Sequence, residues 1–328
     1  MESSDLIGQL KKLKSKSFYL FLGLFLAFQS CGGPNDIKNV NSPTTGKIKI
    51  LVDETFKPII ESEIDVFQSI YKYAEITPIY KTETESLNEL FNDSTDLVIV
   101  SRKLSAKEKK FFEDKKMYPK ETKIAVDGVA LIVNNNNSDT LISWGMLKKI
   151  LTGEITKWKE LNPKSKLNDL KVVFDNKNSS TVRYAIDSIC KEKPLSTKLQ
   201  ALSYNADVVD FVSKNENAIG IIGVSWVSNK QDSSSLSFLN KIKVMGVSSE
   251  ADATPENSYQ PYQAYIAQKQ YPLTRCIYVI NAEGMSGLAS GFAAFLASDR
   301  GQRIILRSGI LPATQPIRIV ELNKNNPE

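Results

Sequence analysis

The sequence of 328 residues contains no histidine, and this absence excludes several kinds of enzyme site at once. Ser-His-Asp triads and Cys-His pairs both need an imidazole to carry a proton, and most zinc sites use histidine ligands. No group of acidic residues in the sequence shows the spacing of a metal site either. The composition therefore favours a protein that is not an enzyme and that needs neither a metal nor a cofactor.

Cysteine is almost as scarce, with three in the whole chain. Cys190 and Cys276 could form one disulfide after export, but nothing in the sequence brings them together, and two buried free thiols are an equal alternative. The net charge is only +5, and residues 1–31 supply +2 of it through four lysines, Glu2 and Asp5. The small remaining excess does not indicate nucleic-acid binding.

The apolar run Phe18–Phe28 is too short to span a bilayer and follows the four lysines, which is typical of an export signal. Its end resembles a bacterial lipoprotein signal, in which a small residue, here Ser30, precedes a cysteine, here Cys31, that becomes the acylated first residue. Phe28 departs from the leucine usual in such signals, and a plain secretory signal with an incidental cysteine is the alternative. We expect residues 1–30 to be the signal and residues 31–46 to be a flexible tether.

Beyond residue 46, apolar strands alternate with amphipathic helices. The expected strands are 47–52, 76–80, 96–100, 171–174, 217–226 and 241–247, and the expected helices include 59–70, 87–91, 106–116, 288–296 and 302–306. This alternation predicts an α/β fold with a largely parallel sheet, whose ligand crevice lies at the carboxyl ends of the strands. Thr55, Thr84, Ser101 and Arg102 all fall at such ends. Two longer apolar runs, 124–133 and 271–280, are candidates for strands that cross between two lobes.

One stretch stands out because an apolar strand, 171–174, leads through a polar loop into three consecutive hydroxyl residues, Ser179, Ser180 and Thr181. After them Tyr184, Ile186, Ile189 and Cys190 recur at helical spacing. The three hydroxyl residues are therefore expected at a helix N-terminus, where free backbone N–H groups and the helix dipole attract an anion. Ordinary capping of the helix by Ser or Thr is the alternative.

The order of these motifs resembles the phosphate-binding proteins of bacterial ABC transporters over roughly residues 47–313. The motifs concerned are Thr55-Phe56, Ser101-Arg102, Gly128-Val129-Ala130, Ile150 to Ile155 ahead of Trp158, Ser179-Ser180-Thr181, Ala218-Ile219-Gly220 and Tyr271 to Arg275. The resemblance implies the type II periplasmic-binding-protein fold, in which two α/β lobes joined by a two-strand hinge close over an oxyanion. The implied domains are 47–126 with 272–322 for lobe 1, 127–271 for lobe 2, and a loose tail, 323–328.

The resemblance also implies ligand contacts, residue by residue. Thr55 and Phe56 match the family's first phosphate loop, Thr84 matches a serine at a helix start, and Ser101-Arg102 match a third loop that normally supplies an aspartate. The fourth loop normally reads Arg, three residues, then Ser-Gly-Thr, whereas this chain has Asp175, three residues, then Ser179-Ser180-Thr181. Compared with the family, the acidic residue of the third loop and the basic residue of the fourth therefore look exchanged. Ser180 also replaces a glycine, and this departure bears more on the identity of the ligand than on the fold.

The exchange has a physical interpretation. Arg102 would clamp the oxyanion, and Asp175 would accept from the proton that phosphate, unlike sulfate, carries near neutral pH. The alternative is that Asp175 only caps its loop and Arg102 pairs with a surface carboxylate. Arg275 matches the family motif but is expected to stabilise the hinge rather than to contact the ligand.

The implied partners are inorganic phosphate or a similar oxyanion, an ABC transporter permease, and a membrane reached through lipid on Cys31, with the protein itself a monomer. Three alternatives stay open at this point. The ligand could be sulfate, molybdate or tungstate; a phosphatase could use Ser179 with Lys177; or the fold could serve adhesion or sensing at the cell surface without a transporter.

Overall fold

The computed structural model describes residues 41–228 and 233–316, so the predictions for the signal, Cys31, most of the tether and the tail lie outside it. The strands are β1 (Thr45–Asp53), β2 (Tyr73–Lys81), β3 (Leu97–Val100), β4 (Lys120–Asn134), β5 (Leu141–Ser143), β6 (Lys171–Phe174), β7 (Gln200–Ala201), β8 (Ala218–Gly223), β9 (Ile242–Val244), β10 (Gly246–Ser248), β11 (Thr274–Asn281) and β12 (Leu311–Pro312). The helices are η2 (Glu54–Phe56), α2 (Lys57–Ile70), α3 (Glu83–Phe91), α4 (Ala106–Asp114), α5 (Trp144–Leu151), α6 (Trp158–Leu161), α7 (Ser180–Tyr184), η3 (Ala185–Cys190), α8 (Asn205–Lys214), α9 (Ser225–Ser228), α10 (Ser233–Leu239), α11 (Gln263–Ala267), α12 (Leu288–Ala297) and α13 (Asp299–Arg307).

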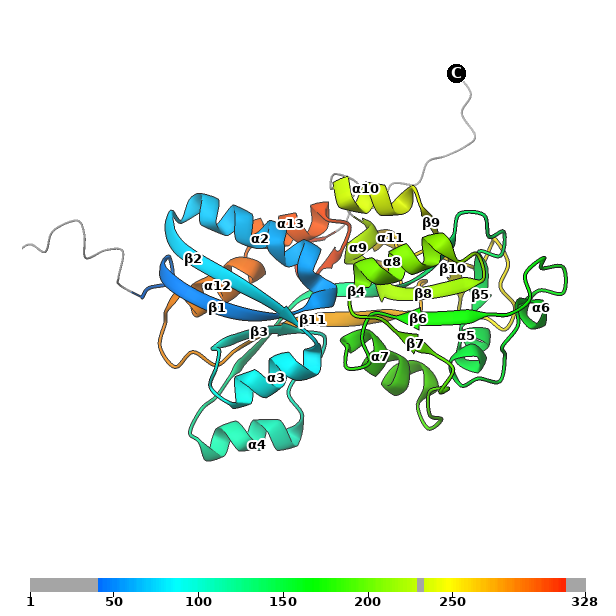
Figure 1. Cartoon of the computed structure of the whole chain (residues 1–328). Coiled ribbons are helices and arrows are strands. Elements are labelled where there is room, and N and C mark those ends of the chain that lie inside the picture. The colour runs from blue at the N-terminus through cyan, green and yellow to red at the C-terminus, as the bar shows by residue number, and fades with distance from the viewer. Residues whose placement is uncertain (1–40, 229–232, 317–328) are drawn as a thin grey trace, which may run out of the picture. The chain divides into compact units, whose positions relative to one another are not determined.

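The long strand β4 runs through the middle of the main sheet, whose order is β2-β1-β3-β11-β4-β8-β6-β7 (Figure 1). Its first part, Lys120–Gly128, pairs antiparallel with β11, and its second part, Val129–Val133, pairs antiparallel with β8. The segment before β11 joins the same point, because Leu273 O accepts from Val129 N at 2.8 Å. Two neighbouring segments therefore connect the two parts of the sheet where the sequence predicted crossing strands.

We call the strands β1–β3 and β11 with their helices the first half, and β6–β8 with their helices the second half. In the first half, β1 pairs in parallel with both β2 and β3, so these three strands end at one edge of the sheet. In the second half, β6 pairs in parallel with β7 and β8. Figure 1 shows α2, α12 and α13 over one face of the first half, and α3 and α4 below the other.

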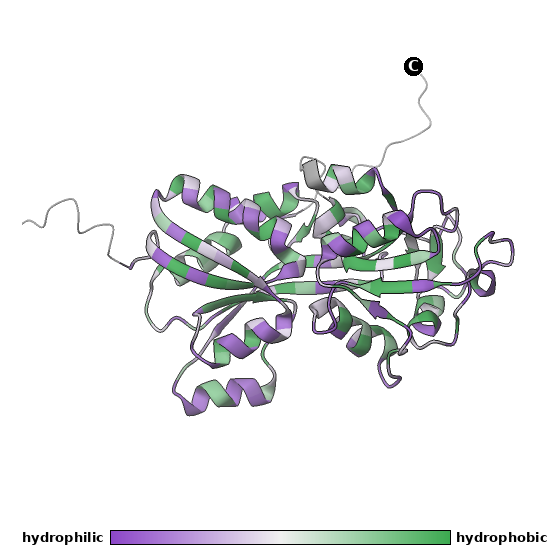
Figure 2. Cartoon of the chain, in the orientation of Figure 1, coloured by the Kyte–Doolittle hydropathy of each residue, from purple (hydrophilic) through white to green (hydrophobic). Residues whose placement is uncertain are grey.

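Burial follows this layering. Some buried residues of the second half, among them Trp158 and Phe174, form one apolar cluster. A larger cluster continues from Phe56 and Phe67 in the first half to Ile132 and Val208 in the second. Figure 2 shows hydrophobic residues along the central strands and hydrophilic ones over most of α4. Continuous apolar strands are what a sheet covered on both faces requires, and the shared cluster means that the halves bury apolar surface against each other.

The strand expected at 217–226 is too long, because β8 ends at Gly223 and Ser225 begins the short helix α9. Two other local expectations were also wrong. Residues 241–247 do not form one strand: β9 pairs with β4, but Gly246 N donates to Thr140 O, and β10 pairs with β5 in a separate sheet. The second concerns Ile186, which is 41% exposed rather than on the buried face. Ile186 follows the buried Tyr184 by two residues, about 200° around a helix, so the two side chains cannot share one face; after Tyr184 the chain continues as the π-helical segment η3.

Cys190 and Cys276 are both free thiols, but only Cys190 is buried, so the alternative of two buried free thiols holds in part. Within the described residues, no helix combines the length and apolar character needed to cross a bilayer.

Candidate functional site

The hydroxyl stretch lies at the start of a helix, as predicted. Ser179 is the N-cap of α7, and its Oγ accepts from Val182 N at 3.2 Å. The same Oγ donates to Asp175 Oδ1 at 2.6 Å, so Asp175 and Ser179 hold the loop between β6 and α7 together. Ser180 and Thr181 are fully buried behind this loop. The loop therefore combines capping with a buried carboxylate.

The first loop, after β1, reaches the same carboxylate from the other half. Thr55 Oγ1 donates to Asp175 Oδ2 at 3.3 Å, and Thr55 N donates to Asp53 Oδ1 at 3.0 Å. The carbonyl of Thr55 accepts from Ser225 Oγ at 2.8 Å and from Trp226 Nε1 at 3.1 Å, both in the second half. The structure thus brings Thr55, Asp175 and Ser179 together at the carboxyl ends of β1 and β6.

A second contact across the halves centres on Glu83, whose side chain is 2% exposed at the start of α3. Its Oε2 accepts from Ser101 N and Ser101 Oγ, each at 2.8 Å, and its Oε1 accepts from Arg183 Nε. Arg183 Nη2 also donates to Ser101 Oγ at 2.7 Å. Ser101 is therefore occupied by a carboxylate of the chain itself, within an ion pair that joins α3 to α7.

Thr84 and Arg102 lie less centrally than Thr55 and Ser179. Thr84 is exposed, and its hydroxyl donates across the halves to Asn178 O at 3.3 Å. The Arg102 guanidinium donates bidentately to Glu108 at 2.7 and 2.8 Å. That hydrogen-bonded pair lowers the pKa of Glu108 to about 2. This geometry fits the alternative in which Arg102 pairs with a carboxylate of its own half, and the role of Arg102 as a clamp on the oxyanion stays a prediction.

Several buried carboxyl groups surround Asp175, and burial raises the pKa of most of them. Burial raises the pKa of Asp175 above its ordinary value, and it raises the pKa of Asp53 to about 6 with a further contribution from Glu83. Burial raises the pKa of Glu54 to about 7 despite hydrogen bonds from Asn205. Burial opposes ionisation of Glu83 too, but its ion pair with Arg183 lowers the pKa overall. Near neutral pH the site is therefore less negative than its composition suggests, and a neutral carboxyl can donate a hydrogen bond to an anion.

A cavity of about 320 Å³ opens at this place. It is lined from both halves, by Asp53, Glu54, Tyr80, Lys81, Thr82, Glu85, Asp175, Asn176, Ser179, Ser203 and Tyr204. Thr82, the N-cap of α3, lines the cavity, whereas Thr84 does not. Phe56, Ser180 and Thr181 lie behind the lining.

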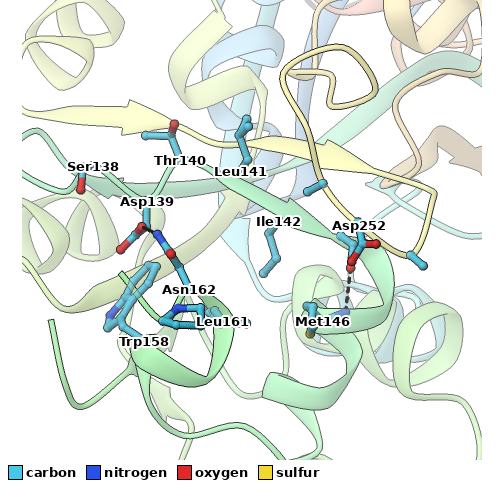
Figure 3. A pocket seen from close by; sticks show the side chains of 14 residues that line it. Ser138, Asp139, Thr140, Leu141, Ile142, Met146, Trp158, Leu161, Asn162 and Asp252 are labelled. Atoms are coloured by element: carbon cyan, nitrogen blue, oxygen red, sulfur yellow. Dashed lines mark hydrogen bonds between the residues drawn. The ribbon is translucent and has the colours of Figure 1, made fainter. Parts of the chain in front are cut away.

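A second cavity of about 420 Å³ lies in the second half and shares no lining residue with the first (Figure 3). Its wall includes Asp139, which accepts from Asn162 Nδ2 at 2.5 Å and from Ser165 Oγ at 2.5 Å. The carboxylate of Asp139 is therefore committed to holding the loop around Asn162 and Ser165.

Among the residues that sequence reasoning missed are Glu54, which lines the cavity, and Asn205 and Arg183, which bond carboxyl groups near it. Glu54 accepts from Asn205 Nδ2 at 2.6 Å and from Asn205 N at 3.3 Å, and Asn205 Nδ2 also donates to Asp175 Oδ2 at 3.2 Å. Glu54 directly follows β1, so its position at a strand end was a usable signal. Arg183 lies four residues after Ser179, one helical turn on, but its partner Glu83 is distant in sequence. No sequence pattern marked Asn205.

The family model for a PBP superfamily domain matches residues 39–300. The phosphate-binding protein PstS of Staphylococcus saprophyticus is 26% identical over 280 residues, which cover 84% of this chain and 82% of that protein. PstS of Staphylococcus aureus strain USA300 is 26% identical over 286 residues, which cover 86% of this chain and 83% of that protein.

Two solved structures show the same fold. A putative phosphate ABC transporter substrate-binding protein with bound phosphate from Clostridium perfringens matches with a TM-score of 0.69 and 22% identity, covering 82% of this chain and all of that one. An ABC-type phosphate transport receptor from Vibrio cholerae matches with a TM-score of 0.59 and 20% identity, covering 81% of this chain and all of that one. These likenesses confirm the expected type II periplasmic-binding-protein fold. Because the family model spans most of the sequence, the chain belongs to the PBP superfamily.

Proposed function

We propose that this chain is a solute-binding protein that captures inorganic phosphate between its two halves. The observation that carries the proposal is the cavity of about 320 Å³ at the strand ends, lined from both halves and containing the N-cap residues of α3 and α7. Hydroxyl and amide donors that converge from two halves on one small space suit a compact oxyanion. The relatives named as phosphate-binding proteins support phosphate as the first candidate.

In this proposal the Thr55 and Ser179 hydroxyls turn from Asp175 to the ligand, and Asp175 then accepts from the proton on phosphate. Both hydroxyls donate to Asp175 in the structure, so the ligand replaces one acceptor by another without leaving a donor unpaired. Burial raises the pKa of Asp175, which suits a carboxylate that shares a proton. Arg102 contributes no direct contact while Glu108 holds it.

The wider role follows from the sequence features outside the described residues. We propose that the chain is exported, that lipid on Cys31 anchors it to a membrane, and that it acts as a monomer that delivers phosphate to an ABC transporter permease. Incorporation of labelled palmitate into the wild-type protein but not into Cys31→Ser supports the anchor. Equal labelling of both would show that lipid, if present, lies elsewhere.

Isothermal titration tests the ligand. Wild-type protein, refolded from denaturant to remove bound anions, is titrated with phosphate, sulfate, molybdate and tungstate at pH 6 and pH 8. We expect phosphate to bind one per chain and more tightly than sulfate, and Asp175→Asn to reduce that preference. Asp169→Asn, an exposed aspartate of the same half, is the matched control. Tighter binding of another oxyanion would replace phosphate in the proposal, and no heat with any of them would end it.

A further inference from the structure

Arg275, at the start of β11, is a buried cation to which the proposed function has so far given no role. The residue is 5% exposed. Its Nε donates to Asp127 Oδ2 at 3.0 Å, its Nη2 lies 3.0 Å from the same oxygen, and Arg275 and Asp127 face each other in the β11–β4 register. The guanidinium also lies over the Phe56 ring, 5.0 Å from its centroid. One side of Arg275 is therefore fixed to the segment that joins the two halves.

The other side of Arg275 reaches the hydroxyl stretch. Nη1 donates to Ser180 Oγ at 2.9 Å and lies 3.4 Å from Thr181 Oγ1 as a second acceptor. A guanidinium can only donate hydrogen bonds, whereas a hydroxyl carries one proton and two lone pairs. Both hydroxyls must therefore use a lone pair toward Arg275 and direct their protons away from it. Arg275 decides which way these two buried donors point.

Ser180 directly follows Ser179, which lines the cavity. Burial and the charge of Glu83 raise the pKa of Asp53, another lining residue, and the charge of Arg275 and the Ser180 side chain offset part of that rise. Burial raises the pKa of Asp127 and Asp175 as well, and the charge of Arg275 offsets part of that rise. Arg275 is thus the counter-ion of Asp127, and its charge favours the ionised forms of Asp53 and Asp175.

We propose that Arg275 is a positioning residue for oxyanion binding, acting through Ser180 and Thr181 by holding their hydroxyl protons toward the ligand side. The proposal rests on the proposed function and adds a specific role for Ser180. Ser180 stands where the fourth loop of the family that the sequence resembles has a glycine. In the structure, its side chain accepts from the guanidinium and lies next to Ser179, which lines the cavity.

A double-mutant cycle tests this link by phosphate titration. We expect Arg275→Gln to weaken phosphate binding about 30-fold in the wild-type background, the range of a charge-assisted hydrogen-bond network. In the Ser180→Ala/Thr181→Val background the same change should cost less than about threefold, because the groups through which Arg275 acts are gone. Arg303→Gln, an exposed arginine on α13, is the control and should leave affinity unchanged.

Equal losses from Arg275→Gln in the two backgrounds would overturn the inference. Arg275→Lys keeps a buried cation, and we expect it to restore part of the affinity lost in Arg275→Gln. If Arg275→Gln does not fold, as judged by circular dichroism, the cycle is measured with Arg275→Lys, and additivity again refutes the link. Absence of phosphate binding by the wild type would instead refute the proposed function.

Discussion

Glu63 offers a sharp test of how the first half is assembled. This residue lies on α2, its side chain is fully buried, and neither carboxyl oxygen has a hydrogen-bond partner among the described residues. Burial alone raises the pKa of Glu63 from 4.5 to about 9. The folded protein therefore holds this carboxyl in its neutral form at pH 7, whereas the unfolded chain ionises it.

The sign of the pH effect follows from proton uptake. Between pH 4.5 and about 9 the folded state binds one more proton than the unfolded state, so the contribution of Glu63 to stability is greatest below pH 4.5 and falls as the pH rises. Over the 2.5 pH units between 4.5 and 7, at 1.36 kcal/mol per unit, the loss is about 3 kcal/mol. Replacing Glu63 by Met, which has a similar volume and no ionisable group, should remove this loss.

Urea denaturation of the wild type and Glu63→Met at several values between pH 4.5 and pH 8.5 provides the measurement. We expect the advantage of Glu63→Met to grow with pH and to reach about 3 kcal/mol at pH 7, or about 6 °C in Tm. Glu63→Gln separates loss of charge from change of shape. Glu61→Gln, a half-exposed neighbour on the same helix, is the control and should show no such growth. A difference between wild type and Glu63→Met that is independent of pH would refute the reasoning.

Two further predictions concern the cleft. An added Cβ at Gly223 would overlap the Thr55 Cγ2 methyl of the other half and lie 3.2 Å from Arg275 Nη2, so we expect Gly223→Ala to weaken phosphate binding at least tenfold by titration. Gly220→Ala is the control, because its added Cβ meets only side chains of β4 and α8, and it should lower Tm with little change in affinity per folded molecule. Glu54→Gln should make the ratio of wild-type to variant phosphate affinity pH-dependent, falling as the pH rises through about 7 and Glu54 ionises; a constant ratio would contradict this. Because both proteins are measured at the same pH, the ionisation of phosphate itself does not affect the affinity ratio.

The sequence predicted the elements that local pattern controls. The strands at 47–52 and 171–174 and the cap Ser179 follow from short apolar runs and from a side chain that bonds its own backbone. The fold class followed from strand–helix alternation together with the resemblance. The ligand contacts and the domain boundaries stay predictions.

The sequence does not reveal which residues that are distant along the chain pair with each other. Glu83 and Arg183 are 100 positions apart, and nothing near either residue marks the other as its partner. The change from α-helix to the π-helical segment η3 after Tyr184 is also not marked in the sequence. The sequence allows Arg102 to pair with a surface carboxylate, but only the position of α4 identifies that carboxylate as Glu108.

The shared strand β4 has a consequence for how the protein loses its structure. One part of β4 pairs with β11 in the first half, and the other part pairs with β8 in the second half. Neither half can therefore unfold fully without taking a hydrogen-bonded strand away from the other. The apolar cluster that continues across the halves adds to this dependence. The described chain should therefore unfold as one cooperative unit, with the fluorescence of its three tryptophans and the far-ultraviolet dichroism changing at the same temperature.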